Sequence, residues 1–218
     1  MNYYGIDIKV PTPEEELAQT QVRGEQAQVL MEKNPRLSFI TAFIIAGDQA
    51  SARRSLDWMR QGLAFEHAVG LVGSYGRLGF LLDAEREGFI TRDQLLDALP
   101  EYWPGSDPDD TDRRFLDLWF EAFKRNGRVA VGDPLPRRTL LTVYRGQFPE
   151  ESYGIAWTLD RKVAQRFADG ASLRTPTPGG VILKGRVRRS DVLAYLTERG
   201  ESEVILDPRV IAWIERVK

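Results

Sequence analysis

The sequence VYRG at residues 143–146 is followed by GIAWT at 154–158 and, nearer the C-terminus, by ESEVIL at 201–206. Each stretch combines the β-branched and aromatic residues typical of strands with one or two polar side chains. An arginine, a hydroxyl and two carboxylates buried among strands cost free energy unless they pair with one another or bind a ligand. The three stretches therefore indicate a β-rich unit that carries a polar site.

Residues 140–218 show mainly the hydrophobic pattern of strands. Short apolar runs are separated there by glycine, proline and aspartate. We expect strands at 141–145, 154–159, 181–187, 192–196, 203–206 and 210–214, and one helix at 160–168. One helix among six short strands is typical of an α+β unit.

The first 135 residues show helical periodicity instead. Helices are expected at 37–46, 48–59, 92–99 and 109–125, with Gly47-Asp48 ending the first of them. Glycine and proline at positions 132, 134 and 136 then mark a boundary. The predicted organisation is a helical region at 1–135, which recognises a partner or covers the site, and a core at 136–218.

Three acids begin the last of these helices. Asp109, Asp110 and Asp112 stand at its start, and Lys124 and Arg125 at its end. Carboxylates are stabilised near a helix N-terminus and cations near a C-terminus by the helix dipole. We therefore interpret the acids as a helix N-terminus and not as a metal site.

Composition excludes several classes of site. The 218 residues contain no cysteine and one histidine, His67. Disulfides, thiolate metal sites and multi-histidine metal sites are excluded, and a Ser-His-Asp triad is disfavoured. The net charge of −2 does not favour a broad grip on nucleic acid. With no secretory signal and no apolar run long enough to cross a bilayer, we expect a cytoplasmic protein that does not bind a membrane.

Two stretches imitate ligand-binding motifs. Residues 83–94 resemble a calcium loop with Gly88 at its sixth position, but Gln94 stands where a bidentate glutamate is needed. We interpret this stretch as two helices joined by a turn, with Thr91 capping the second. Glycines at every third position fit no phosphate loop and are interpreted as turns or close helix contacts: Gly70, Gly73, Gly76 and Gly79.

In their order, VYRG, GIAWT and ESEVIL resemble the Arg–Ser/Thr–Glu-x-Glu signature of the ADP-ribosyltransferase superfamily of the diphtheria and cholera toxin type, on its arginine-type branch. The resemblance covers about residues 140–218. It implies a mixed or antiparallel two-sheet core and NAD as co-substrate. The chain departs from the family in having Ala-Trp-Thr at 156–158, where the family has Ser-Thr-Ser.

The chemistry of the family gives each matching residue a role. Breaking the bond between ribose and nicotinamide creates positive charge on the ribose, which a carboxylate stabilises. The resemblance implies that Glu203 bonds the ribose 2′-hydroxyl, that Glu201 engages the acceptor and that Thr158 orients the catalytic glutamate. Arg145 would hold the diphosphate, because its planar fork matches phosphate oxygens. The backbone of Gly146 would hold the nicotinamide.

The glutamate spacing has its own geometric meaning. Residues two apart on a strand share one face, so Glu201 and Glu203 are expected to point the same way. Taken without the other stretches, the pair also fits a charged strand edge that prevents aggregation.

The sequence leaves two alternative roles for each of two further residues near these stretches. Trp157 lies against the cofactor or belongs to the core. Arg174, in the loop at 169–180, binds phosphate or lies on a plain surface loop. Residues 195–200 correspond to the loop that often reads the protein acceptor in the family, and Tyr195 and Arg199 are its candidate contacts.

The resemblance favours an NAD-dependent mono-ADP-ribosyltransferase of the kind found among bacterial effectors, toxins and phage proteins. The expected target is macromolecular, a protein arginine ahead of nucleic acid. One alternative is an NAD glycohydrolase, with water as acceptor. The other is a non-catalytic binding protein with a vestigial transferase fold, which the single hydroxyl of Ala-Trp-Thr keeps open. The sequence does not fix the oligomeric state.

Overall fold

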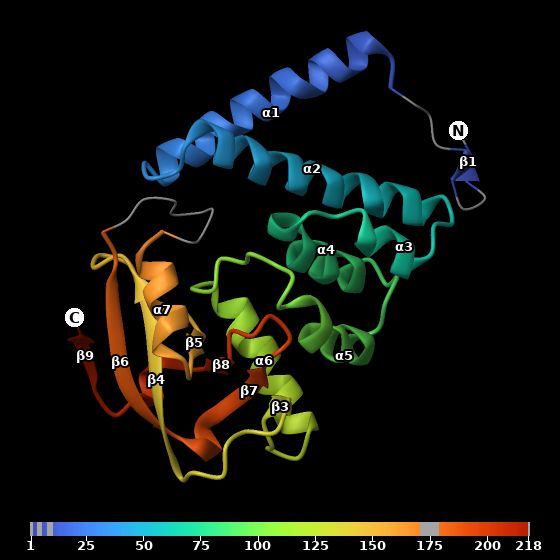
Figure 1. Cartoon of the computed structure of the whole chain (residues 1–218). Coiled ribbons are helices and arrows are strands. Elements are labelled where there is room, and N and C mark those ends of the chain that lie inside the picture. The colour runs from blue at the N-terminus through green and yellow to red at the C-terminus, as the bar shows by residue number, and fades with distance from the viewer. Residues whose placement is uncertain (1, 4–5, 8–10, 171–178, 218) are drawn as a thin grey trace. The chain divides into compact units, whose positions relative to one another are not determined.

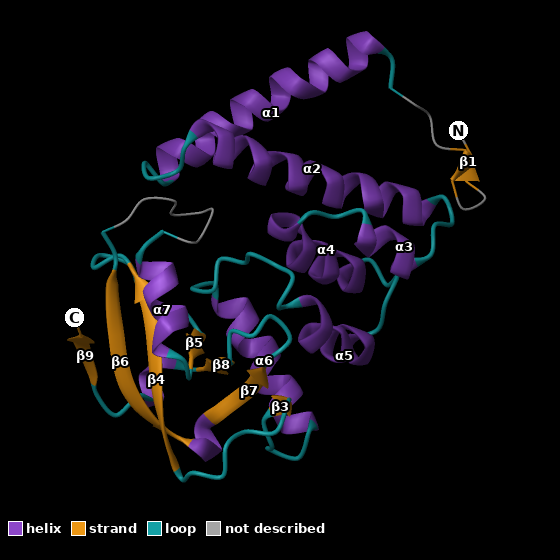
Figure 2. Ribbon diagram, in the orientation of Figure 1, coloured by secondary structure: helices purple, strands orange, loops and turns teal. Residues whose placement is uncertain are grey.

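The computed structural model describes residues 2–3, 6–7, 11–170 and 179–217. By internal contacts the chain forms two units (Figure 1). Residues 1–95 and 105–108 make the helical unit, and residues 96–104 and 109–218 make the sheet unit. Helices dominate the first and strands the second (Figure 2).

The helical unit is built from four helices and a short hairpin among its described residues. The helices are α1 (Pro13–Lys33), α2 (Phe39–Arg60), α3 (Phe65–Gly70) and α4 (Ser74–Arg86), and the hairpin pairs β1 (Asn2–Tyr3) with β2 (Ile6–Asp7). Ala27 of α1 packs against Ala42 and Ile45 of α2. A capping box between Thr12 and Glu15 starts α1.

The expected helix end at Gly47-Asp48 is wrong, because α2 continues through both residues. The Asp48 side chain instead reaches α4, where its Oδ2 accepts the backbone N–H of Tyr75 at 3.1 Å. Side chains at Gly73 and Gly76 would collide with Asp48. The prediction of close helix contacts is thus confirmed for these two glycines.

Helix α5 (Arg92–Tyr102) begins in the helical unit and ends in the sheet unit. Its start follows the predicted cap, because the backbone N–H of Gln94 donates to Thr91 Oγ1 at 3.2 Å. Helix α6 (Arg113–Arg125) has Asp112 as its N-cap, as its acids predict. The predicted boundary at 135 places α6 with the N-terminal helices, whereas in the structure α6 belongs to the sheet unit.

The described part of the sheet unit forms one mixed sheet of seven strands, which confirms the α+β class. The strands, in spatial order, are β3 (Val131–Gly132), β7 (Val192–Leu196), β8 (Glu203–Leu206), β5 (Ala156–Thr158), β4 (Leu140–Gln147), β6 (Val181–Arg188) and β9 (Ile214–Val217). The β3–β7 pair is parallel and the other pairs are antiparallel.

This sheet is narrowest in its middle, between β5 and β4. Strands β4 and β6 pair over eight residues, whereas β5 meets β4 at the single pair Tyr144 and Thr158. The two-sheet core expected from the resemblance is therefore a single hydrogen-bonded sheet with one narrow link.

The sheet core explains why these strands form. Leu141, Val143, Trp157, Val204 and Leu206 are buried together in one apolar cluster. Helix α7 (Arg161–Ala168) covers part of the sheet, with Ala164 and Ala168 against Ile182 of β6. Removal of this apolar surface from water is the main stabilising contribution.

One predicted strand is wrong. Residues 208–210 form a 3₁₀ turn in place of the first part of a strand at 210–214. Proline starts the turn, and the Asp207 carboxylate accepts the backbone N–H of Arg209 at 3.0 Å. Strand β9 begins only at Ile214. Within the described residues, no helix combines the length and apolar content needed to cross a membrane.

Candidate active site

The three sequence stretches meet in one row across the sheet. Glu203, the first residue of β8, is aligned with Thr158 of β5, and Thr158 is aligned with Tyr144 of β4. Arg145 follows Tyr144 on β4. Since neighbouring strands lie about 5 Å apart, the backbones of Glu203 and Arg145 are about 10 Å apart. Segments separated by up to about sixty residues in the sequence are thus brought to one place.

Glu203 is a carboxyl group that resists ionisation. Burial raises its pKa from the ordinary 4.5 to about 7, and the charges of Glu201 and Asp110 act in the same direction. A hydrogen bond from Trp103 and the charge of Arg199 oppose the rise. A carboxyl with a pKa near neutrality is characteristic of functional sites, although structural clusters also produce one.

Trp103 holds Glu203 directly. Its indole Nε1–H donates to Glu203 Oε1 at 3.0 Å. Trp103 follows the end of α5 and is itself fixed by edge-to-face contacts with Phe115 and Trp119 of α6, at centroid distances of 5.8 and 5.6 Å. The sequence did not single out this residue. The available signal was a tryptophan that, once buried, needs a hydrogen-bond acceptor for its N–H.

Glu201 lies before the strand and not on it. Strand β8 starts at Glu203, and Ser202 has a left-handed φ of 45°. The expectation that strand alternation puts both carboxylates on one face is therefore wrong, because Glu201 is not on the strand. The two charges are nevertheless close enough for Glu201 to raise the pKa of Glu203. Ser202 is strained, because residues other than glycine rarely adopt this conformation.

Two arginines flank the Glu201 carboxylate. Arg166 Nη2 of α7 lies 3.9 Å from Glu201 Oε1, and Arg199 Nη2 lies 3.7 Å from the same oxygen. The Glu201 side chain is 16% exposed. Arg199 also donates from Nη1 to the Pro104 carbonyl at 2.7 Å. Glu201 thus lies between two guanidinium groups just before the start of β8.

The Thr158 hydroxyl supports the loop that carries the glutamates. It is buried, donates to the Glu201 carbonyl at 2.5 Å and accepts the Asp160 N–H at 3.0 Å. The expected hydrogen bond from Thr158 to the Glu203 carboxylate is made by Trp103 instead. The hydroxyl therefore positions the glutamate loop through its backbone.

Arg145 is held on every side of its guanidinium. Nε donates to Gln147 Oε1 at 2.7 Å, and Nη1 donates to the Ala156 carbonyl at 2.7 Å. Nη1 and Nη2 donate to the two carboxylate oxygens of Asp110 at 2.5 and 3.2 Å. The Arg145 and Asp110 side chains are 14% and 18% exposed. This is a bidentate pair in the geometry that Arg forms with carboxylate or phosphate.

Asp110 was expected only to start a helix, and its real position gives it a larger role. Besides Arg145, its Oδ2 accepts the Ala156 N–H at 3.2 Å. Its backbone carbonyl accepts the Ile155 N–H at 3.0 Å. A side chain at Gly154 would collide with the Asp110 carboxylate, so glycine is needed there. Asp110 thus ties the segment before α6 to β4 and β5.

Three further residues singled out by sequence occupy other surroundings. Trp157 is 2% exposed, lies in the sheet core and donates from Nε1 to the Gly154 carbonyl at 3.0 Å. Gly146 faces α7, where a side chain would collide with the Ala164 carbonyl. Tyr195 lies on β7 and packs against the core. Arg174 lies outside the described residues.

No group of three or more His, Asp or Glu side chains that could hold a metal ion occurs in the described part of the chain. His67 is exposed on α3.

The arrangement provides a partly buried carboxyl, an indole donor that fixes it and a second carboxylate flanked by cations. Such a set can stabilise a developing positive charge and, at the second carboxylate, accept a proton. Comparison with protein-family models, curated proteins and solved structures finds no match for this chain.

Proposed function

We propose that this chain is an NAD-dependent mono-ADP-ribosyltransferase that modifies a macromolecular target, a protein arginine in the first place. The observation that carries the proposal is the alignment of Glu203, Thr158 and Tyr144 across β8, β5 and β4. Arg145 follows Tyr144 on β4, and the Asp110 carboxylate that it binds is close enough to Glu203 to raise the pKa of Glu203. Three stretches chosen from sequence for one chemistry lie side by side in the fold. The narrow link between β5 and β4 fits the two-part core of the resembling family.

Glu203 is the group proposed to act on the ribose. Its carboxylate would accept a hydrogen bond from the ribose 2′-hydroxyl. It would also stabilise the positive charge at the ribose carbon from which nicotinamide leaves. The ionised form does this work, so burial that disfavours ionisation strengthens its attraction for a cation. Trp103 fixes the carboxylate orientation through its indole N–H.

Glu201 is proposed to receive the proton of the acceptor. Arg166 and Arg199 lie 3.9 and 3.7 Å from its Oε1, so a guanidinium group already fits beside this carboxylate. This geometry favours a cationic acceptor such as arginine, because the same carboxylate can draw in another guanidinium.

Arg145 is proposed to hold the diphosphate of NAD. In the structure the Asp110 carboxylate accepts from Arg145 Nη1 and Nη2, the two donors that phosphate oxygens would use. Binding therefore requires the Asp110 carboxylate to give up at least one of its two contacts with Arg145. Phosphate, with three or more acceptor oxygens, can replace a carboxylate on the same fork.

The test is transfer of label from NAD to protein in a cell lysate. Wild type is compared with Glu203→Gln, with Glu201→Gln and with Glu215→Gln, an exposed glutamate on β9 that serves as the matched control. We expect Glu203→Gln to lower transfer by about 10²-fold or more, because it removes the charge that stabilises the transition state. Glu215→Gln is expected to match wild type.

The Glu201→Gln variant separates transfer from hydrolysis. If Glu201 serves the acceptor, this variant loses transfer to protein and still releases free ADP-ribose. Free ADP-ribose from wild type, with no labelled macromolecule, would favour an NAD glycohydrolase. NAD left intact by wild type under all conditions would contradict the enzymatic proposal and favour a binding protein.

A further inference from the structure

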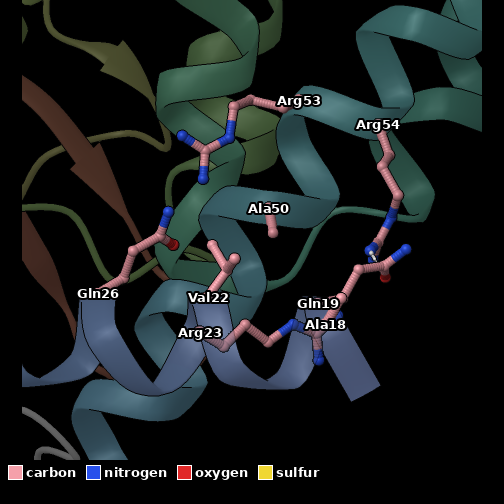
Figure 3. Close-up of a pocket in the computed structure, with 8 residues that line it drawn as sticks. All are labelled: Ala18, Gln19, Val22, Arg23, Gln26, Ala50, Arg53 and Arg54. Atoms are coloured by element: carbon pink, nitrogen blue, oxygen red, sulfur yellow. Dashed lines mark hydrogen bonds between the residues drawn. The ribbon is translucent and has the colours of Figure 1, made fainter. Parts of the chain in front are cut away.

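A groove runs between α1 and α2 of the helical unit, with a volume of about 240 Å³. Figure 3 shows side chains from both helices facing it. Its lining combines small apolar, amide and guanidinium side chains: Ala18, Gln19, Val22, Arg23, Gln26, Ala50, Arg53 and Arg54. None of these eight residues is acidic.

The three arginines of the groove come from two helices. Arg23 belongs to α1, and Arg53 and Arg54 belong to α2. Arg54 Nη1 donates to Gln19 Oε1 at 3.3 Å, which is a neutral partner. Figure 3 shows the guanidinium groups of Arg23 and Arg54 near one another and that of Arg53 apart from them. The lining contains no carboxylate, whereas Arg145 of the sheet unit is paired with Asp110.

This arrangement leaves charge and polar atoms unsatisfied. Burial lowers the pKa of Arg54, and the charge of Arg23 lowers it further. Arg23 Nε and Gln26 Oε1 are buried and have no hydrogen-bond partner among the described residues. Buried polar atoms are nearly always paired, so each unpaired one calls for an explanation.

Arginine stems often cover apolar surface while their charged ends reach water. That account explains Arg53, which is exposed. It does not explain why the Nε of Arg23 is buried, or why Arg54 lies beside another cation. An anion bound between the guanidinium groups would remove both penalties at once.

We propose that the groove between α1 and α2 binds a phosphate-bearing small molecule, held by Arg23 and Arg54. The planar forks match phosphate oxygens, which accept several N–H groups together. Ala18, Val22 and Ala50 supply an apolar floor for the organic part of a phosphate ester. The Gln26 Oε1 atom can accept a hydroxyl of that part.

The groove favours a small ligand over a nucleic acid. Its volume suits a diphosphate or the phosphate end of a nucleotide, and the chain carries a net charge of −2. A nucleic acid backbone requires a longer basic track to gain affinity from counterion release. The site lies within the helical unit and does not depend on the function proposed for the sheet unit.

Titration calorimetry of the full chain tests the site, with sodium pyrophosphate and with ADP at low ionic strength. The groove variant is Arg23→Gln with Arg54→Gln. The matched control is Arg36→Gln with Arg86→Gln, which removes two charges outside the groove. We expect wild type and control to bind alike, and the groove variant to bind about tenfold more weakly or worse.

A second variant guards against loss of folding. Ala18→Trp fills the groove and keeps every charge, and Ala18 is exposed on α1. We expect it to block binding as well. If pyrophosphate and ADP each bind, phosphate alone suffices. If ADP binds and pyrophosphate does not, the nucleoside contributes to binding.

Three results would overturn the proposal. The first is absence of heat with either compound in wild type. The second is equal affinity in wild type and in the groove variant, with loss of binding in Arg145→Gln, which would move the phosphate site to the sheet unit. The third is a short single-stranded DNA that binds through the groove more tightly than either small compound.

Discussion

Glu203 in the sheet unit and Arg54 in the helical unit are both placed where their ionised forms are disfavoured. Burial dominates each case, and a like charge adds to it: Glu201 and Asp110 beside Glu203, and Arg23 beside Arg54. Arg145 offers the contrast, because its guanidinium has a carboxylate on its fork. The difference separates a charge whose partner of opposite sign must be displaced before a ligand binds from charges that lie beside a like charge.

This comparison matters because buried charge is costly in either setting. For a paired charge, attraction to the partner offsets much of the free energy lost on desolvation, so removal of the partner destabilises the fold. For an unpaired charge little of that free energy is offset. Its removal therefore stabilises the fold and reduces binding or activity. The sign of the stability change therefore distinguishes the two classes.

The largest expected effect concerns the Arg145–Asp110 pair. Asp110→Ala leaves Arg145 buried without its carboxylate and removes the acceptor of the Ala156 N–H. We expect it to lower the free energy of unfolding by about 3 kcal/mol or more. Chemical denaturation measures the loss.

Asp109→Ala is the matched control for Asp110→Ala. The exposed Asp109 carboxylate accepts from Thr111, at 3.1 Å from the backbone N and 2.6 Å from Oγ1. We expect a loss of about 1 kcal/mol or less. Equal losses in the two variants would show that the pair with Arg145 does not stabilise the fold.

The next effect is the pH dependence that Glu203 imposes on stability. Its pKa is about 7 in the folded chain against an ordinary 4.5, so the folded state binds more protons between these values. Stability accordingly falls as the pH rises from about 4.5 to 7. Glu203→Gln removes this loss, which amounts to at most the order of 3 kcal/mol.

Denaturation of wild type and Glu203→Gln at pH 5 and pH 8 measures the pH effect. The free energy of unfolding of the variant, relative to that of wild type, is expected to increase as the pH increases. A constant difference between the two proteins over this range would show that Glu203 ionises normally.

A smaller effect is expected from Trp103→Phe. The change removes the indole N–H that favours the ionised form of Glu203, so the pKa of Glu203 rises above about 7. Activity that depends on the carboxylate then appears at a higher pH, by about one unit. The pH profile of the transfer reaction measures it.

Trp157→Phe is the control for Trp103→Phe. Its indole N–H also has a buried acceptor, but that acceptor is the Gly154 carbonyl. Both changes remove packing and a hydrogen bond, and only Trp103→Phe is expected to move the pH profile. A shift of the same size in both variants would assign the effect to packing.

The smallest effect belongs to the groove. Arg54→Gln relieves repulsion from Arg23 and is expected to raise the free energy of unfolding by about 0.5 kcal/mol or less, because solvent screens partly exposed charges. Arg60→Gln, on the same helix, removes an arginine that pairs with Glu87 at 2.6 Å and is expected not to stabilise. A stability gain in Arg60→Gln equal to that in Arg54→Gln would contradict the distinction.

Sequence was a good guide where local patterns decide the structure. The strand positions near Arg145, Thr158 and Glu203 follow from short apolar runs, and the helix at 160–168 follows from its apolar spacing. Prediction failed at Gly47-Asp48, because tertiary contact with α4 outweighs the helix-ending tendency of glycine. It failed at 210–214, because proline and Asp207 favour a turn.

The candidate site was predicted only in part, for a physical reason. The site residues on the strands could be recognised in the sequence, because they are polar residues in apolar surroundings. Trp103 and Asp110 come from the segments around α5 and α6, and their partners lie 100 and 35 positions away along the chain. No local pattern encodes such contacts. The left-handed Ser202 likewise could not be read from a strand-like sequence.

The central claim is that Glu203 is an available carboxyl group that titrates near neutrality. Carbon-13 NMR of protein labelled at the glutamate carboxyl carbons measures this directly, with Glu203→Gln identifying the signal. The account predicts one glutamate that titrates near pH 7 and whose pKa falls when NAD is added, because the positive nicotinamide ribose favours the ionised form. Titration of every glutamate below pH 5, with no response to NAD, would contradict it.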